Sequence, residues 1–439
     1  MTVLIHHALI LPMSAREGEP RWFHGSVGIA GERIVMVVRA EGEEARQEVA
    51  AFRERHGSGL REIDGAGKLV MPGLINIHTH AAMTLMRGYA DDMPLMPWLS
   101  EKIWPFEAKM NRDDVELGAR LGIAEMLLGG TTTFVDMYWM EEAVACAVCD
   151  AGIRAVLSPA FIDSRFAEFE RDLHQLMKEY YGGRIRVMVG PHSPYTCSAE
   201  SIRRGIALSE AYDIPLHIHL SETQSEVKIM RERYGKTSAE WLEEMGFFER
   251  PALAVHAVHL TGGDRTILRK HGVSVAYNPE SNMKLGSGAA PIARMLDEGI
   301  NVGIGTDGAS SNNDLDMWGE MRSGAFLQKV TTGDPTVLPA YEVLKMATVN
   351  GARAIGRGEE LGQICEGMLA DLIVVDLEKP HLAPGFDPAA NLVYCGKNSD
   401  VDTVIVNGRI VVEQGKLLTL DPAVLCRAAD LRAREISMR

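Results

Sequence analysis

Residues 70–80 read Val-Met-Pro-Gly-Leu-Ile-Asn-Ile-His-Thr-His, an apolar run that ends in two histidines separated by one residue. The segment Leu74–Thr79 is typical of a buried strand, because short apolar runs that follow turn residues favour that structure. Side chains alternate along a strand, so His78 and His80 point to the same side. Because imidazoles are common ligands of transition metals, the segment predicts a strand that ends at a metal site.

Strand-like and helix-like segments alternate through the middle of the chain. The expected strands are Leu74–Thr79, Thr133–Met137, Arg154–Pro159, Ile185–Gly190, Pro215–Leu220, Ala252–Ala257, Val273–Tyr277 and Val302–Thr306. Helix-like segments lie between most of them, for example Val115–Leu128, Ile202–Ala211 and Ala239–Glu244. Eight parallel strands with intervening helices are the elements of a (β/α)8 barrel of the TIM type.

Both ends of the chain are instead rich in short strands. The expected strands are Thr2–Leu11, Ser26–Ala30, Arg33–Val38, Asp371–Asp376, Val401–Val406 and Arg409–Glu413. Asn407-Gly408 is a strong hairpin signal between the last two, and a charged helix or loop over 41–61 interrupts the first group. We therefore expect an α/β protein with a small β-sandwich domain, built from residues 1–70 and 360–439, beside a barrel over 71–359.

The composition narrows the choice of partners. The formal net charge is -15, and an acidic surface repels nucleic acids and anionic membranes, so we expect neither as a partner. Six cysteines are too few for a disulfide scaffold, and the one Cys-x-x-C pair, Cys146 and Cys149, has no second pair nearby. Together with the lack of a leader-like or membrane-spanning apolar segment in the sequence, this favours a cytoplasmic protein.

Three further strands end in residues that bind metals or carry protons. His219 ends the fifth strand and Glu222 follows it, His256 lies at the end of the sixth, and Asp307 follows the eighth. In this class of barrel the active site is built at the carboxyl ends of the strands, so these side chains are expected to meet. The nearby His217 and His259 are expected to pack or to support the ligands.

Histidines and an aspartate with an open position match a catalytic zinc-type site, which lowers the pKa of a bound water to ~7. Asp307 can accept the proton of that water, Glu222 can carry a proton to the leaving group, and His256 can orient the hydroxide. The end of the fourth strand, Gly190-Pro191-His192-Ser193-Pro194, lacks the lysine that, in carboxylated form, bridges two metals in related barrels, so one metal is expected.

The chain resembles the amidohydrolase superfamily, and within it the 5′-methylthioadenosine/S-adenosylhomocysteine deaminase group. The segments that carry the resemblance are MPGLINIHTHAAMTLMRGYADD (71–92), GGTTTFVDMY (129–138), GPHSPYTCS (190–198), LHIHLSET (216–223), NPESNMKLGSGAAPI (278–292), GTDGASSNN (305–313) and GMLADLIVVD (367–376). The resemblance implies one divalent metal, usually zinc or iron, bound by His78, His80, His219 and Asp307.

It also implies the reaction, which is hydrolytic deamination of an adenine nucleoside by a metal-activated hydroxide. The substrate would be 5′-methylthioadenosine, S-adenosylhomocysteine or adenosine, and the products the inosine analogue and ammonia. Glu222 would protonate the ring nitrogen and His256 would assist the hydroxide. Glu107 would hold the ribose hydroxyls, and His192 would contact the nucleoside.

The chain differs from the family pattern at one position that concerns the tail of the substrate. In the family an arginine at the end of the third strand is linked to the homocysteine carboxylate, whereas Pro159 stands at the place where we expect it. Arg165 or Arg171 in the following loop could substitute, or could be surface charges. S-Adenosylhomocysteine is therefore the substrate that this departure affects most.

Two alternatives remain from the sequence. The same residues could act on another aminated or chlorinated N-heterocycle, such as a triazine, a pterin or a guanine-like ring. A scaffold without catalysis is the other alternative, although such relatives usually lose metal ligands and this chain keeps them. The resemblance also points to a homo-oligomer, which no pattern in the sequence specifies.

Overall fold

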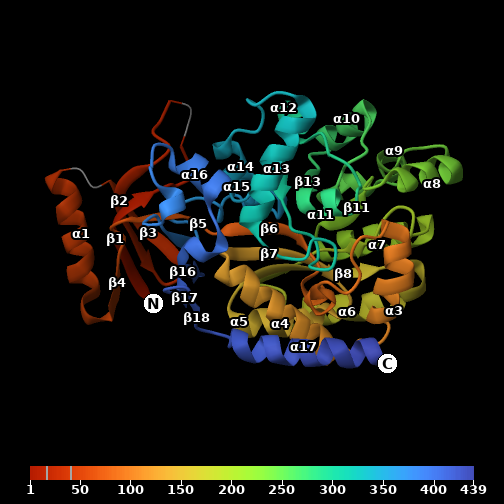
Figure 1. The fold of residues 1–439 in the computed structure, drawn as a ribbon, viewed down its shortest axis with the longest axis horizontal. Helices are drawn as coiled ribbons and strands as arrows, with labels where there is room; N and C mark the ends of the chain where they lie inside the picture. Colours follow the sequence, from red (N-terminus) through yellow and green to blue (C-terminus); the bar gives the residue numbers. More distant parts are fainter. Residues whose placement is uncertain (16–17, 40–41) are drawn as a thin grey trace.

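The computed structural model describes residues 1–15, 18–39 and 42–439, which form a barrel and a terminal sheet side by side (Figure 1). Nine short strands build the barrel, because the expected fourth strand is divided into β9 and β10. These strands are β6 (Leu74–Thr79), β7 (Thr131–Tyr138), β8 (Arg154–Phe161), β9 (Ile185–Val187), β10 (Gly190–Pro191), β11 (Leu216–Leu220), β12 (Ala252–His256), β13 (Ser274–Tyr277) and β14 (Val302–Ile304).

Two parallel sheets close into the barrel. One contains β6 to β10 and the other contains β11 to β14. Parallel bridges join them at both seams, from Thr79 to Asp307 and from Val189 to Leu216. The expected α/β barrel is therefore confirmed, and the carboxyl ends of its strands meet at one mouth.

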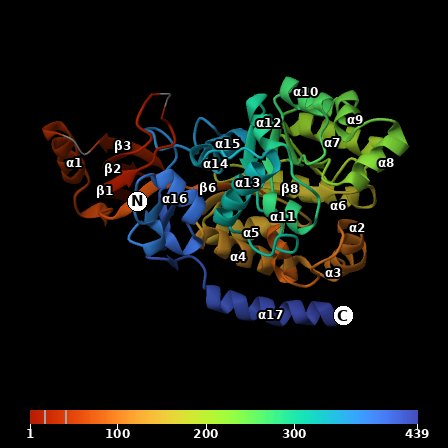
Figure 2. The ribbon, with the colours of Figure 1, turned by 45° about the horizontal axis from the view of Figure 1, so that its top comes forward.

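Helices follow most barrel strands; most cover the outside of the barrel, whereas α2 and α3 carry residues that line a pocket at its mouth (Figures 1 and 2). They are α2 (Leu95–Trp98), α3 (Trp104–Glu107), α4 (Arg112–Leu128), α5 (Glu141–Ala151), α6 (Phe166–Glu179), α7 (Ala199–Tyr212), α8 (Gln224–Tyr234), α9 (Ser238–Glu244), α10 (Gly262–Lys270), α11 (Pro279–Lys284), α12 (Ile292–Asp297), α13 (Met317–Thr332), α14 (Ala340–Met346) and α15 (Val349–Ala354). The helix-like segments expected over 115–128, 202–211 and 239–244 fall within α4, α7 and α9.

The terminal sheet takes strands from both ends of the chain. Its strands are β1 (Thr2–Ile10), β2 (Phe23–Ala30), β3 (Arg33–Arg39), β4 (Leu60–Asp64), β5 (Lys68–Pro72), β15 (Leu372–Asp376), β16 (Val401–Val406), β17 (Arg409–Glu413) and β18 (Lys416–Leu417). The two ends meet where β5 pairs antiparallel with β15. The expected hairpin is present, with Asn407 and Gly408 both at left-handed φ values of 53° and 72°.

Three further helices belong to the two ends. Within the charged insertion expected over 41–61, α1 (Glu43–His56) precedes β4, whereas Glu41 lies outside the described residues. Near the C-terminus, α16 (Pro388–Cys395) precedes β16, and α17 (Pro422–Met438) runs back along the barrel (Figure 2). In the part of the chain that the structure describes, no helix is long and apolar enough to cross a membrane.

The terminal sheet and the barrel are joined with little intervening chain. Only Gly73 separates β5 from β6, and a Cβ at Gly73 would lie 2.1 Å from Thr132 Oγ1, so a larger residue does not fit there. A buried ion pair adds a second link, because Arg154 of β8 donates to Asp371 through Nε (2.8 Å) and Nη2 (3.1 Å). Asn407 completes this group, since its peptide N–H donates to Asp371 Oδ1 (2.7 Å).

Candidate metal centre and active site

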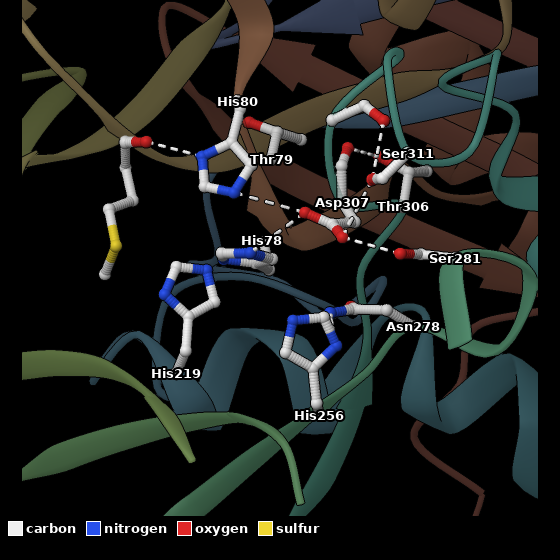
Figure 3. Close-up of polar contacts among 12 residues, drawn as sticks. His78, Thr79, His80, His219, His256, Asn278, Ser281, Thr306, Asp307 and Ser311 are labelled. Carbon is white, nitrogen blue, oxygen red and sulfur yellow. Dashed lines mark hydrogen bonds and ion pairs between the residues drawn. The ribbon is translucent and has the colours of Figure 1, made fainter. Parts of the chain in front are cut away.

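His78, His80 and His219 converge at the barrel mouth (Figure 3), and each has one ring nitrogen within hydrogen-bond distance of a neighbouring group. His80 Nδ1 donates to the carbonyl of Met137, and His219 Nδ1 donates to the carbonyl of His192 (2.7 Å). A carbonyl can only accept, so both rings carry a proton on Nδ1, and Nε2 is the ring nitrogen that faces the centre. This is the orientation that a metal ligand requires.

His78 lies deepest in this group and is fully buried. Its Nδ1 lies 3.1 Å from His217 Nε2, and His217 Nδ1 lies 2.9 Å from Ser158 Oγ. His217 thus supports His78, which is the supporting position expected from the sequence. His259 lies apart from the centre, since its Nε2 contacts the carbonyl of Ser287 (2.7 Å).

Asp307 supplies the carboxylate of the centre. Its Oδ1 lies 3.3 Å from His78 Nε2 and 3.2 Å from His80 Nε2. Its Oδ2 accepts hydrogen bonds from Ser281 (2.7 Å) and Ser311 (2.9 Å), which fixes the orientation of the carboxylate. Burial lowers the pKa of His80 and the Asp307 carboxylate raises it more strongly, to about 9. The carboxylate therefore stabilises positive charge at this point.

The donor set fits a divalent metal ion. The Nε2 atom of His78 is buried and makes no hydrogen bond, although Asp307 Oδ1 is near, which is costly for a polar atom unless a ligand satisfies it. His78, His80 and His219 bring ligand atoms within 4.8 Å of one another, as do His78, His256 and Asp307. Three imidazoles and one carboxylate are a donor set that zinc and similar ions prefer.

Glu222 lies beside this centre in an environment that keeps its carboxyl group neutral. Burial first, and then the charge of Asp307, raise the pKa of Glu222 to about 8. Its Oε1 accepts a hydrogen bond from Ser287 Oγ (3.3 Å), and its Oε2 lies 3.8 Å from His256 Nε2. At neutral pH the group therefore carries a proton that it can donate.

Glu226 holds the loop that carries Glu222, and nothing in the sequence singled it out. Its carboxylate accepts the peptide N–H groups of Ser221 (2.8 Å) and Glu222 (3.0 Å) and the hydroxyl of Ser238 (2.6 Å). The residue is buried on α8, one helical turn beyond the loop. Its position three residues after Thr223, in the Thr-x-x-Glu pattern that begins helices, is the signal that could have identified it.

His256 is held from behind by two amides. Asn282 Nδ2 lies 2.9 Å and Asn278 Nδ2 lies 3.3 Å from His256 Nδ1, which leaves Nε2 on the side of Glu222. The backbone of His256 has a left-handed φ of 70°, and that of Asp307 has a φ of 62°. Such φ values are uncommon for residues other than glycine and concentrate at functional sites.

A pocket opens above the centre. Its lining includes almost every residue expected at the site, namely His80, Glu107, His192, His219, Glu222, His256 and Asp307. The remaining walls are largely apolar or aromatic, among them Trp98, Trp104, Trp139, Tyr195 and Leu285, none of which the sequence indicated. Apolar walls with a few placed polar groups are typical of a small-molecule site.

Glu107 and His192 take different positions around this pocket. Glu107 ends α3, and burial raises the pKa of its carboxyl group. Its Oε2 lies 3.4 Å from Trp139 Nε1, whereas its Oε1 is buried without a partner. His192 follows β10, and its ring nitrogen Nδ1 lies 3.0 Å from Thr196 Oγ1. Glu107 thus lines the pocket with a buried carboxyl group held beside Trp139.

A second cavity adjoins the first, and the two share Glu107, Trp139 and Ala160. The strand β8 extends to Phe161, and alternation directs Ala160, rather than Pro159, into both cavities. Arg165 and Arg171 both line the second cavity. Arg165 stacks over the Trp139 ring (4.3 Å) and pairs with Glu168 (2.7 Å), so its charge is already partly engaged.

A closed parallel barrel that carries three histidines and an aspartate at its mouth, with a neutral carboxylic acid beside them, defines a metal-dependent hydrolase of the α/β-barrel class. The sequence signature of the amidohydrolase family matches residues 69–411. The chain belongs to this family.

Similar proteins support the same assignment. A 5-methylthioadenosine/S-adenosylhomocysteine deaminase of Desulfitobacterium hafniense (strain DSM 10664 / DCB-2) is 46% identical and aligns with 100% of this chain and 99% of its own length. An adenosine deaminase of Xanthomonas campestris with bound zinc is 34% identical, with a TM-score of 0.92 over 100% of this chain and 99% of its own. Atrazine chlorohydrolase of Arthrobacter aurescens TC1, complexed with zinc, is 26% identical, with a TM-score of 0.87 over 98% and 100% of the two chains.

Proposed function

We propose that this protein hydrolyses the 6-amino group of an adenine nucleoside, namely 5′-methylthioadenosine, S-adenosylhomocysteine or adenosine, to give the inosine analogue and ammonia. The observation that carries the proposal is the placement of neutral Glu222 and of partly unpaired Glu107 in the pocket that holds the metal donors. The protonated Glu222 suits hydrogen bonding to a ring nitrogen, and the carboxyl group of Glu107 suits a pair of ribose hydroxyls. Full-length similarity to deaminases of this name supports the same substrate class.

The metal is proposed to be one zinc ion, held by His78, His80, His219 and Asp307. Zinc is favoured over iron because two similar structures, an adenosine deaminase and a chlorohydrolase, contain it. When bound, such an ion lowers the pKa of a water molecule and so supplies a nucleophile near neutral pH.

The residues around the metal donors are proposed to move the protons. Glu222 donates its proton to the ring nitrogen next to the carbon under attack, which makes that carbon more electrophilic. Asp307 Oδ1 accepts the proton of the attacking water, while Ser281 and Ser311 hold Oδ2 in place. His256 Nε2 orients the incoming oxygen. The amino group then takes up the proton that Asp307 accepted from the water, and it leaves as ammonia.

Glu107 and His192 are proposed to position the nucleoside. The unpaired Oε1 of Glu107 can accept a hydrogen bond from a ribose hydroxyl, and Trp139 Nε1 limits the rotation of the carboxylate. His192 lies next to His219, with ring centroids 4.9 Å apart, so it can contact the ligand beside the metal donors.

Substrates without a carboxylate are proposed to be preferred. The end of β8 presents the methyl group of Ala160 to the pocket, and Arg165 is paired with Glu168. Comparing kcat/KM for 5′-methylthioadenosine, adenosine and S-adenosylhomocysteine tests this preference. Arg165→Gln and Arg171→Gln test the two candidate arginines, and selective loss of the last substrate in one variant would assign the tail to that residue.

The proposed reaction is tested by ammonia release and by the change from adenine to hypoxanthine absorbance with zinc-loaded protein. Turnover of at least one of the three nucleosides is expected. If none is turned over while the protein is folded and holds zinc, the substrate assignment is wrong.

Another N-heterocycle is the second candidate substrate, because the chlorohydrolase has nearly the same fold. Glu107 separates the two candidates, since a triazine or pterin has no ribose to bind. If Glu107→Gln leaves turnover of the best substrate unchanged, that substrate is not recognised through its ribose.

The two parts of the chain are proposed to be distinct domains, a β-sandwich over 1–70 and 360–439 and a barrel over 71–359. In support, the terminal sheet has its own buried core, which includes Val3, Val27 and Leu372. A cytoplasmic location is also proposed, supported by the six unpaired cysteines. The homo-oligomer stays a prediction, which light scattering on the purified protein tests.

A further inference from the structure

A second group of histidines lies on β1 of the terminal sheet, which stands beside the barrel (Figure 1). His6 and His7 on β1 and Asp64 at the end of β4 bring ligand atoms within 4.8 Å of one another. His6 is half-buried, and His7 and Asp64 are exposed. The proposed deaminase activity uses none of these residues.

A bulge in β1 brings the two histidine rings together. Consecutive residues of a regular strand point to opposite faces, so neighbouring rings normally diverge. Between Ile5 and Ala8 the register with β2 shifts by one residue, and His7 has a left-handed φ of 60°. The rings consequently lie with their centroids 4.4 Å apart. Bulges of this kind redirect side chains, often for function.

The three ligand atoms form a triangle of suitable size. The edges are 3.0 Å between the two Nδ1 atoms, 3.3 Å from His7 Nδ1 to Asp64 Oδ1, and 4.0 Å from His6 Nδ1 to the same oxygen. Tetrahedral zinc with bonds of about 2.0–2.2 Å keeps its ligand atoms about 3.3–3.6 Å apart. The triangle therefore matches one face of such a site after shifts of a few tenths of an ångström.

The surroundings orient two of these ligands. Glu62 Oε2 lies 3.3 Å from His6 Nε2, which favours the tautomer that leaves His6 Nδ1 unprotonated. Arg53 holds Glu62 in turn, with its Nε 3.0 Å and its Nη2 2.8 Å from Oε2. The peptide N–H of Ala66 donates to Asp64 Oδ1 (3.2 Å). A carboxylate behind a histidine ligand is a common feature of metal sites.

We propose that His6 Nδ1, His7 Nδ1 and Asp64 bind a second divalent transition-metal ion, of the zinc or copper class, on the terminal sheet. Two imidazoles and one carboxylate favour such ions over magnesium and calcium, which prefer oxygen ligands. Solvent completes the coordination, because His7 and Asp64 are exposed. The ion links the bulge of β1 to the end of β4, and its role is structural.

Zinc content after equilibrium dialysis against Zn²⁺ tests the site. The wild-type protein is expected to bind one more zinc ion per chain than His7→Ala. Asp64→Asn, which keeps the shape of the side chain, is expected to bind this ion more weakly. His24→Ala changes an exposed histidine on the neighbouring strand β2 and is expected to bind as much zinc as the wild type.

The measured quantity is a difference between variants, so it is independent of the barrel ion and of the proposed reaction. His7→Ala is expected to keep the wild-type rate of ammonia release. Equal zinc content in wild type and His7→Ala would overturn the proposal, because the histidines would then form only a hydrogen-bonded group. An equal loss in His24→Ala would also overturn it, since binding would then be a general property of surface histidines.

Discussion

The buried ion pair between Arg154 and Asp371 gives a prediction of large effect. Replacing Arg154 by Met removes the guanidinium group but retains most of the apolar volume of the side chain. Asp371 then stays buried, at 4% side-chain exposure, without its cationic partner. Removal of one member of a buried pair typically costs about 3–5 kcal/mol, because the remaining charge has lost its partner. We expect the free energy of unfolding to fall by that amount.

Urea denaturation followed by tryptophan fluorescence measures this change. Arg61→Met is the matched control, because Arg61 pairs with Glu413 at 56% and 30% side-chain exposure and should contribute only about 0.2–1 kcal/mol. The double variant Arg154→Met, Asp371→Leu should recover much of the loss, since no unpaired charge remains. The reasoning is refuted if Arg154→Met costs no more than Arg61→Met, or if the double variant is less stable than the single one.

Further predictions concern the active site. Glu222→Gln should lower kcat by about 10²–10⁴-fold while the zinc content measured by mass spectrometry is unchanged, because the variant lacks the proton donor but keeps the metal ligands. In the wild type, kcat should fall as the pH rises above about 8, where Glu222 loses the proton it must donate, and Glu222→Gln should lack that decline. Chelation should abolish ammonia release and added zinc should restore it, whereas His219→Ala should fail to recover because it lacks one ligand. Glu226→Gln should lower kcat by a smaller factor than Glu222→Gln, since it only loosens the loop; an equal loss would show that Glu226 is more than a positioning residue.

The barrel and the convergence of the histidines and Asp307 at its mouth could be predicted because they depend on local patterns. Alternation along β6 decides that His78 and His80 share a side, and short apolar runs separated by helices indicate the remaining strands. His219, His256 and Asp307 meet because parallel strands end at one mouth, which is a property of the fold and not of those residues.

The rest of the pocket depends on the path of the loops and on exact strand ends. Trp139 and Tyr195 reach the pocket from segments after β7 and β10, and no local pattern specifies where those segments lead. At the end of β8 the predicted pocket position was wrong by one residue, since Ala160 lines the pocket where Pro159 was expected. Because the side-chain period of a strand is two, an error of one residue selects the wrong face.

The path from β5 to β6 also bears on protein engineering. Between Lys68 and Thr79 only Gly73 lies outside a strand. The strand that carries His78 therefore has no flexible linker before it. Transfer of the barrel alone into another protein would cut the chain at β5. The partner of β5 in the terminal sheet, β15, lies about 300 residues away in the sequence. Libraries that recombine relatives should therefore exchange the terminal strands together with the barrel and place their crossover points in surface loops such as 333–339, which carries no strand pairing.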